Sequence, residues 1–409
     1  MKNGGVMNIE RELYINKISS LLQNEQIKVI TGVRRCGKSY LLNTIVDTLY
    51  KQGIDKNHII YLSMEDMDNI KYRDCQTCHE YIVGKIMDSD KYYILIDDVQ
   101  LIHNWEQVVN SLRLRNTSIV ITGSNSTILS GELATLLAGR YVEFQLRTIS
   151  FSEYYNSLLK IHDHVDVRES MEYYIKHGGY PIVLASNLND TQTESIISDI
   201  YNSTILKDVI VKNNVKDEVL MNKLINYLLD NVGNLVSLRK ISDYINSNGE
   251  KTNPTTIGNY VRALEKAYAI EKVSRYDIKG KELLSTIDKY YVADHSLMYV
   301  RKGYSIEYIG QIMENIVYND LKRRGYRVYV GKLGDKEVDF VAEKQNSKIY
   351  VQVCYSIAQN STLQRETESL LAIADNYNKY IVTMDSLAKG NKDGIEFVYL
   401  PQFLLMENL

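Results

Sequence analysis

The segment from Ile30 to Leu42, ITGVRRCGKSYLL, constrains the fold of this chain more than any other part of it. A glycine, four residues and Gly-Lys-Ser follow the apolar run IKVIT and precede the amphipathic pattern YLLNTIVDTLY. This order of strand, glycine-rich loop and helix is the context in which a P-loop is found. The segment therefore predicts a loop that binds phosphate groups at the start of a helix.

Each residue type in this loop has a physical reason to be there. The two glycines let the backbone curl so that N–H groups point at phosphates, and the helix N-terminus adds a favourable field. We expect Lys38 to reach the β- and γ-phosphates and the Ser39 hydroxyl to bind Mg²⁺. The residues expected to contact the nucleotide are Gly32, Arg35, Cys36, Gly37, Lys38, Ser39 and Tyr40. Binding of the phosphates by the loop backbone does not need the side chains of Arg34 and Arg35, which we expect to face a neighbouring subunit or a lid.

A second apolar run, YYILIDDVQ at 92–100, ends in two carboxylates. In P-loop proteins one such carboxylate holds Mg²⁺ and the next orients the attacking water. We therefore assign Asp97 to Mg²⁺ and Asp98 to water activation. Glutamate is the more usual base, and the side chain of Asp98 is one methylene shorter. This leaves two alternatives, a slower hydrolysis or a bridging water that takes over the role.

A third apolar run, SIVITGSN at 118–125, ends in a polar cluster. A residue in that place hydrogen-bonds the γ-phosphate or the attacking water, and we expect Asn125 to do so, with Ser124 as second choice. Further along, Arg140 follows a predicted short helix. An arginine that one subunit delivers to the γ-phosphate of its neighbour stabilises the charge of the transition state. Arg140 is a candidate for that role, and a structural ion pair is the alternative.

Short apolar runs at 27–31, 58–64, 92–97, 118–122 and 141–146 alternate with helical patterns. This alternation indicates an α/β fold with a parallel sheet that helices cover on both faces. We expect a P-loop core over residues 1–149 and a helical lid over 150–215, which contains HGGYPIV. A winged helix is expected over 216–303 and a small α/β domain over 304–409.

The composition is that of an ordinary globular protein, with 44% hydrophobic and 24% charged residues. A net charge of −3 excludes a protein that coats nucleic acid through bulk charge, so contact with DNA has to come from a local basic face. No apolar stretch approaches about eighteen residues, and there is no secretory signal or disulfide framework, so we expect a cytoplasmic protein without a membrane partner. The pair Cys75 and Cys78 is half a zinc site, and we expect an exposed loop and helix start there instead.

Three helical patterns followed by two strand-like segments, between about 217 and 300, are typical of a winged helix-turn-helix. Ser237 and Asn253 are suitable N-caps, and Pro254 occupies a favourable first helical position. We expect the third helix to pack inward through Ile257, Val261 and Leu264. The residues expected to face a DNA groove are Thr255, Thr256, Asn259, Arg262 and Lys266, with Arg275, Lys279 and Lys281 near the wing. Winged helices also dock proteins or oligomerise, so DNA binding has that alternative.

The last segment reads as a helix, three strands, a helix and a strand, and it resembles the PD-(D/E)xK nuclease fold. The resemblance rests on Glu314 in the first helix, Asp339 in the second strand and the third strand YVQVCY. Active members of that fold carry Glu-x-Lys on the third strand, where the carboxylate binds metal and the lysine positions the nucleophile. This chain has Gln352 and Cys354 there. We therefore expect a domain retained for binding, and whether Glu314 and Asp339 hold a metal stays open.

The ordered series GVRRCGKS, LIDDVQ, ITGSNSTILSGELATLLAGR and RTISFSEY closely resembles the prokaryotic AAA+-like ATPases of the archaeal-type family. HGGYPIV and ALEKAYAIEKVSRYDIKGKELLSTIDKYYVADHSL resemble the middle segments of that family, so the resemblance covers most of the chain. It implies an ASCE-type P-loop core with a helical lid, ATPase activity, and an Arg140 that acts between subunits. Asp98 departs from the family, which more often has glutamate there.

These features together favour an oligomeric ATPase that uses ATP and Mg²⁺ and couples its nucleotide state to DNA binding or remodelling. One alternative is a slow nucleotide switch, in signalling or defence, that acts through protein–protein contacts. A lower alternative is a metal-dependent nuclease that the ATPase powers.

Overall fold

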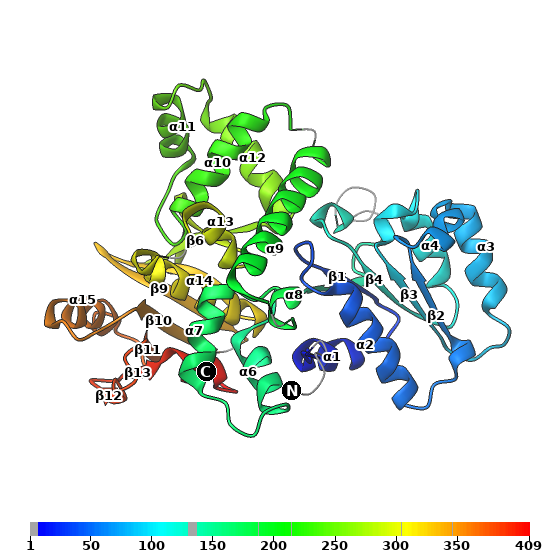
Figure 1. The fold of residues 1–409 in the computed structure, drawn as a ribbon, viewed down its shortest axis with the longest axis horizontal. Coiled ribbons are helices and arrows are strands. Elements are labelled where there is room, and N and C mark those ends of the chain that lie inside the picture. The colour runs from blue at the N-terminus through cyan, green and yellow to red at the C-terminus, as the bar shows by residue number, and fades with distance from the viewer. Residues whose placement is uncertain (1–6, 130–136, 187, 214, 304, 346) are drawn as a thin grey trace. The chain divides into compact units, whose positions relative to one another are not determined.

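The structure of the chain is a computed structural model that describes residues 7–129, 137–186, 188–213, 215–303, 305–345 and 347–409. The chain divides into two compact units (Figure 1). The N-terminal unit comprises Glu10–Arg147 with Lys266–Tyr268, and the C-terminal unit comprises Met1–Ile9, Thr148–Glu265 and Ala269–Leu409. Within the described ranges we find no helix with the length and apolar character that a membrane span requires.

A parallel sheet of five strands lies at the centre of the N-terminal unit, in the order β2-β3-β4-β1-β5 (Figure 1). The strands are β1 (Ile27–Thr31), β2 (Ile59–Ser63), β3 (Tyr92–Asp97), β4 (Thr117–Thr122) and β5 (Tyr141–Gln145). They coincide with the five apolar runs and pair in parallel, which confirms the predicted α/β fold. All residues of β1, β3 and β4 are buried, as expected for strands covered on both faces.

The helices of this unit are α1 (Glu12–Ser19), α2 (Lys38–Lys51), α3 (Cys75–Lys85) and α4 (Trp105–Leu112). Short 3-10 turns lie at Lys56–His58, Met67–Arg73, Val99–Leu101 and Ser126–Leu129. Helix α3 begins after Asp74, whose carboxylate accepts the N–H of Thr77. The expectation of an exposed loop here is wrong for Cys78, because its side chain is buried in the core that α3 and α4 form against the sheet.

Strand β1 contains a buried lysine inside the sheet. Lys28 of β1 is fully buried, and its Nζ donates to the carbonyl of Asn24 and to the hydroxyl of Ser118, each at 3.0 Å. Burial, with a smaller contribution from the nearby charge of Lys91, lowers the pKa of this ammonium to about 8. Both acceptors are neutral oxygens, so hydrogen bonds hold this lysine inside the sheet.

The C-terminal unit begins with helices. They are α6 (Phe151–Leu159), α7 (Val167–His177), α8 (Pro181–Leu184), α9 (Asp190–Ser203), which continues as a π-helix (Thr204–Val211), α10 (Glu218–Asp230), α11 (Leu238–Ser247) and α12 (Pro254–Lys266). Ser237 and Asn253 cap α11 and α12 as predicted, since they accept the N–H groups of Lys240 and Thr256. The three helices expected over 216–303 are therefore present.

The sequence HGGY forms a buried, close backbone contact in this unit. Gly179 donates its N–H to the carboxylate of Asp294, and its carbonyl accepts the N–H of Ile149. A Cβ at Gly179 would lie 2.3 Å from the carbonyl oxygen of Ile149, so no larger residue fits. The same carboxylate of Asp294 also binds the N–H and the hydroxyl of Ser296. This contact explains the two glycines, because the helical segment before them approaches the backbone after strand β7 (Glu282–Val292) directly.

An eight-stranded sheet follows, in the order β12-β13-β11-β10-β9-β8-β6-β7. Its strands are β6 (Ile270–Asp277), β7 (Glu282–Val292), β8 (Arg327–Leu333), β9 (Lys336–Lys344), β10 (Ser347–Cys354), β11 (Asn378–Thr383), β12 (Gly390–Lys392) and β13 (Ile395–Tyr399). The antiparallel hairpin β6–β7 is the one expected as a wing, and β6 pairs in parallel with β8. The hairpin thus extends the sheet of the last segment across the expected boundary at 303, and the winged helix stays a prediction.

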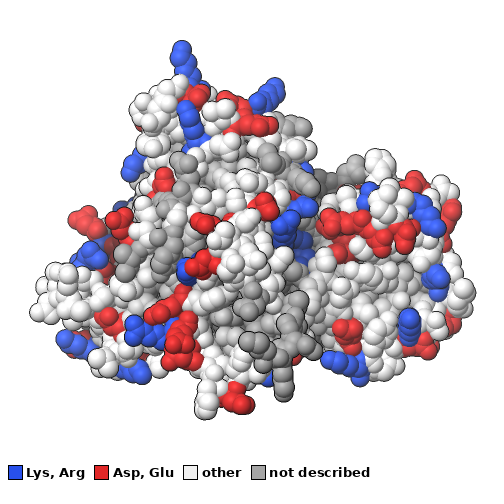
Figure 2. Space-filling view, viewed as in Figure 1, with Lys and Arg blue, Asp and Glu red and all other residues white. Residues whose placement is uncertain are grey.

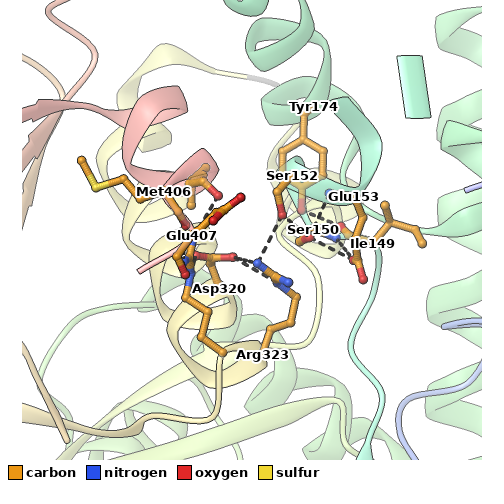
Figure 3. Close-up of polar contacts among 11 residues, drawn as sticks. Ile149, Ser150, Ser152, Glu153, Tyr174, Asp320, Arg323, Met406 and Glu407 are labelled. Atoms are coloured by element: carbon orange, nitrogen blue, oxygen red, sulfur yellow. Dashed lines mark hydrogen bonds and ion pairs between the residues drawn. The ribbon is translucent and has the colours of Figure 1, made fainter. Parts of the chain in front are cut away.

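The remaining helices are α13 (Ser296–Lys302), α14 (Ile309–Arg323), α15 (Asn360–Leu371) and α16 (Leu400–Leu405), with a 3-10 turn at Ile306–Tyr308. The end of α14 holds two other parts of the unit (Figure 3). Arg323 donates to the buried Asp320 and to the hydroxyl of Ser152 at the start of α6. Arg324 donates to the same carboxylate and to the carbonyls of Leu404 and Met406. Charge-assisted bonds therefore fix α6 and the C-terminal end on α14.

Candidate nucleotide-binding site

The predicted P-loop lies between β1 and α2. Gly32 and Gly37 have φ angles of 143° and 101°, which L side chains rarely adopt. A Cβ at Gly32 would lie 2.2 Å from the carbonyl oxygen of Leu146. Gly37 is the N-cap of α2, so the loop delivers its N–H groups to the helix N-terminus. Both glycines are required by the backbone, as the sequence indicated.

Lys38, the first residue of α2, is folded back over this loop. Its side chain is buried, and Nζ donates to the carbonyls of Gly32 at 3.0 Å and Val33 at 3.1 Å. These acceptors are neutral, whereas a phosphate oxygen carries charge and forms a stronger bond with an ammonium. The lysine is therefore positioned to exchange loop carbonyls for a phosphate.

Asp97 ends β3 and is joined to the loop and to β4 by hydroxyl groups. Thr122 at the end of β4 donates its hydroxyl to Asp97 Oδ1 at 2.5 Å and accepts the N–H of Asp98 at 2.9 Å. The hydroxyl of Ser39 also hydrogen-bonds Asp97. Burial raises the pKa of Asp97, and the bonds from Ser39 and Thr122 oppose that shift. A hydroxyl and a carboxylate oxygen are hard ligands of the kind Mg²⁺ takes beside phosphates and water, so this pair suits that ion.

The next residue, Asp98, has an unusual backbone. Its φ is 52°, in the left-handed region, and its Oδ1 accepts the amide of Gln100 at 2.7 Å. The carboxylate lines a cavity in front of the loop. The carboxylate can orient a water there if the amide of Gln100 releases Oδ1, or if Oδ1 accepts both the amide and the water.

This cavity has a volume of about 350 Å³. Its lining consists of Arg34, Arg35, Gly37, Lys38, Ser39, Tyr40, Glu65, Asp98 and Ser124. Arg34 and Arg35 line the cavity of their own chain, and their expected position against a neighbouring subunit or a lid stays a prediction. Glu65 was not foreseen. It follows β2, and its carboxylate lies 4.0 Å from Nη2 of Arg34.

Gly32, Cys36 and Asn125 were expected at the nucleotide but are not among the residues that line the cavity. Asn125 is buried and does not line the cavity, and its carbonyl accepts the N–H of Ile128. Ser124, the second choice, does line it. Cys36 is fully buried, and its carbonyl accepts Nη1 of Arg11 at 3.4 Å. Arg11 also donates to the carbonyl of Arg147, so this buried arginine links the P-loop to the segment that follows β5.

Arg140 lies just before β5 begins, whereas the P-loop follows the end of the neighbouring parallel strand β1. It is exposed, and its carbonyl accepts the N–H of Ile27, the first residue of β1. The loop follows the last residue of β1, and a five-residue strand is roughly 16 Å long. Arg140 therefore does not reach the cavity of its own chain, and its action on a neighbour stays a prediction. The helix expected before it falls in 130–136, outside the described residues.

The residues singled out in the C-terminal segment are engaged with one another. Asp339 receives the N–H of Val353 on its carboxylate, and its own N–H donates to Oε1 of Gln352. The amide of Gln352 donates to Glu366 at 2.6 Å. All of these residues line a second, larger cavity of about 870 Å³, and Glu314 lines it as well.

Comparison with known proteins supports a P-loop ATPase domain in the N-terminal part of the chain. Residues 24–155 match the family described as an AAA domain, and residues 168–305 match a domain of unknown function. An uncharacterised protein of Haemophilus influenzae is 40% identical over 399 residues, which are 97% of this chain and 98% of the relative. An uncharacterised protein of Methanocaldococcus jannaschii is 27% identical over 92% of this chain and 85% of its own length.

One solved structure carries the same fold. The Walker-type ATPase of Pyrococcus abyssi aligns with 74% of this chain and 99% of its own, with a TM-score of 0.51 and 14% identity. At that identity the similarity supports the fold alone. Together with the AAA-domain match and the parallel sheet, it identifies the N-terminal unit as a P-loop NTPase core.

Proposed function

Since this chain belongs to the same protein family as the Haemophilus influenzae relative and contains an AAA domain, we propose that it binds Mg²⁺·ATP and hydrolyses it. One observation carries the proposal. Lys38, Ser39 and Asp98 line a single cavity, and Asp97 lies directly behind Ser39. These residues come from a loop and a strand that are far apart in the sequence, and their meeting at one cavity supports phosphoryl transfer there.

Each residue then has a defined task in the proposed reaction. Lys38 leaves the carbonyls of Gly32 and Val33 and binds the β- and γ-phosphates, whose remaining oxygens accept N–H groups of the loop. Ser39 and Asp97 would hold Mg²⁺, which supplies positive charge against the phosphates when bound. Asp98 orients the water that attacks the γ-phosphorus, and the bond to the β-phosphate oxygen breaks to give ADP and phosphate.

Nucleotide binding tests this assignment directly. Titration of a fluorescent ATP analogue into the Lys38→Ala variant should show an affinity at least tenfold below that of the wild type, because the ammonium is lost. Lys51 lies exposed at the other end of the same helix, so Lys51→Ala is the matched control and should bind as the wild type does. Equal affinities for wild type and Lys38→Ala would remove the loop from the nucleotide site.

We further propose that the nucleotide state controls binding to DNA through α12 and the β6–β7 hairpin. In α12 Ile257, Val261 and Leu264 are buried as expected, which leaves a polar face outward. Of the residues proposed to face DNA, Thr255, Asn259, Arg262, Lys266, Lys279 and Lys281 are exposed. Figure 2 shows Lys and Arg side chains that project around α11 and α12 with acidic side chains between them. Contact with DNA would therefore rest on a few cations.

Salt dependence of DNA binding distinguishes this proposal from its alternative. Loss of one phosphate contact in Arg262→Ala or Lys279→Ala should weaken binding to all sequences and reduce the slope of log K against log salt by about one. Lys51→Ala should leave the slope unchanged. Absence of binding to single-stranded, duplex and branched DNA at low salt would instead favour a slow switch that acts on proteins. The hydrogen bond between Gln100 and Asp98 is the observation that supports slow turnover.

We also propose that the protein acts as an oligomer in which Arg140 serves the cavity of a neighbouring chain. Arg140 is exposed and lies where the strands begin, whereas the cavity lies where they end, and both facts support a role outside its own cavity. Size measurement by light scattering with and without an ATP analogue tests the assembly. A monomer under both conditions would contradict it.

A further inference from the structure

Three carboxylates that line the second cavity, in the C-terminal unit, contact a lysine that the sequence did not single out. Lys289 of β7 is almost fully buried, with 3% of its side chain exposed. Its Nζ lies 2.8 Å from Glu314 Oε1, 2.8 Å from Glu337 Oε1 and 3.4 Å from Asp339 Oδ1. An ammonium has three protons to donate, and here three carboxylates surround it. We call these four residues the Lys289 cluster.

Three separate elements bring the cluster together. Lys289 comes from the β6–β7 hairpin, Glu314 from α14, and Glu337 and Asp339 from β9. The same hairpin is fixed to α14 by two further contacts. Tyr291 donates its hydroxyl to Glu314, and the N–H of Val292 donates to the side chain of Asn315. The position of the ammonium is therefore set by the docking of the hairpin and not by a flexible surface side chain.

The nuclease resemblance implies a divalent ion between Glu314, Asp339 and the third strand, and the residues present do not fit one. Gln352 occupies the third-strand position, and its amide oxygen already accepts the N–H of Asp339. The ammonium of Lys289 lies within hydrogen-bonding distance of both carboxylates. The ammonium occupies the space between these carboxylates, and its positive charge opposes the entry of a second cation there. Among the described residues, His58, Asp88 and Asp90 are the one group of three or more His, Cys, Asp or Glu side chains whose ligand atoms all lie within 4.8 Å of one another, and the carboxylates around Lys289 do not form such a group.

We propose that Lys289 is the resident cation of this cluster: its ammonium takes the place of a divalent ion, holds the three carboxylates together and closes the site to metal. The charges agree with a tightly held ammonium. Burial alone would lower the pKa of Lys289, but the three carboxylates outweigh it and raise the pKa. Burial raises the pKa of Glu314 to about 7, and the ammonium of Lys289 opposes that shift.

Removal of the ammonium should create the metal site that the wild type lacks. In the full-length, nucleotide-free protein, Lys289→Ala leaves three carboxylates around an empty space, so it should bind one more Mn²⁺ ion than the wild type. The bound ion is counted by electron paramagnetic resonance, and the melting temperature should rise by several degrees on addition of Mn²⁺. Lys272→Ala is the matched control, because Lys272 is exposed on the same hairpin and its Nζ lies 4.0 Å from Asp288. It should gain neither the ion nor the shift.

Two results would overturn the proposal. One is a folded Lys289→Ala variant that binds no additional Mn²⁺. The other concerns the wild type and does not depend on the folding of that variant. Glu337 is 38% exposed, so Glu337→Gln is tolerated by the fold and removes one carboxylate of the cluster. Wild type and Glu337→Gln should bind the same number of Mn²⁺ ions, and a wild-type ion that Glu337→Gln loses would show that the cluster binds metal despite its lysine.

Discussion

Substitution of Thr122 by valine tests how the carboxylates of the nucleotide site are positioned. Thr122 is fully buried, and its hydroxyl donates to Asp97 and accepts the N–H of Asp98. Valine has nearly the same shape but neither donates nor accepts. The substitution therefore removes one oxygen that orients two successive carboxylate residues and leaves the packing of β4 intact.

The magnitude follows from the two bonds. A hydrogen bond to a charged group contributes about 1.5–3 kcal/mol and a neutral one about 0.5–1.5 kcal/mol, so Thr122→Val should destabilise the fold by roughly 2–4 kcal/mol. In the site, Asp97 loses a donor that opposes the effect of burial on its pKa. The pKa of Asp97 should rise further, and the acid limb of the pH–rate profile should move to higher pH. A misplaced ligand also reduces turnover, by about 10²-fold for a displacement of about 1 Å.

Steady-state hydrolysis of ATP as a function of Mg²⁺ concentration and pH measures these effects. We expect Thr122→Val to need more Mg²⁺ and to turn over about 10²-fold more slowly, whereas Mg²⁺-free binding of the nucleotide stays unchanged because the loop is intact. Thr122→Ser keeps the hydroxyl and is the matched control. The reasoning is refuted if Thr122→Ser is as impaired as Thr122→Val, or if both keep the Mg²⁺ dependence of the wild type.

Three further predictions concern other residues. Arg140→Ala should reduce turnover by about 10³-fold or more with nearly unchanged ATP affinity, and an equal loss of both in kinetic and binding assays would exclude a role between subunits. The depressed pKa of Lys28 means that the folded state binds fewer protons between pH 8 and 10.5, so stability should rise with pH in that window by at most about 3 kcal/mol, and urea unfolding of Lys28→Met should lack this rise. Gly179→Ala should destabilise the protein by about 2 kcal/mol or more because its Cβ would meet the carbonyl of Ile149. Gly84→Ala, in an open helical position, should leave thermal stability the same or higher.

Local patterns in the sequence were sufficient for the P-loop and for the sheet that carries it. The spacing of Gly32, Gly37 and Lys38 describes a loop within one short segment, and the apolar runs describe buried parallel strands. Asp97 could be predicted because it ends such a run. These signals lie within a few residues of one another, so no tertiary contact is needed to recognise them.

Residues whose role depends on a neighbouring strand or helix could not be predicted in this way. Thr122 looks like an ordinary β-branched residue, and it meets Asp97 only because β3 and β4 are adjacent. Lys289 looks like a surface lysine in DKYYV, but its three carboxylate partners lie between 25 and 50 residues further along the chain. The same limit explains the hairpin expected as a wing. Strand β6 of this hairpin pairs with β8, and the periodicity of the sequence does not reveal that these two strands are neighbours.

Turnover of ATP with and without DNA tests the central claim most directly. The claim is that the P-loop cavity hydrolyses Mg²⁺·ATP and that this hydrolysis is coupled to DNA. We predict Mg²⁺-dependent turnover that at least one of single-stranded, duplex and branched DNA increases at low salt, and that Lys38→Ala abolishes. Turnover that persists in Lys38→Ala would contradict the assignment of the site, and wild-type turnover that no form of DNA changes would contradict the coupling.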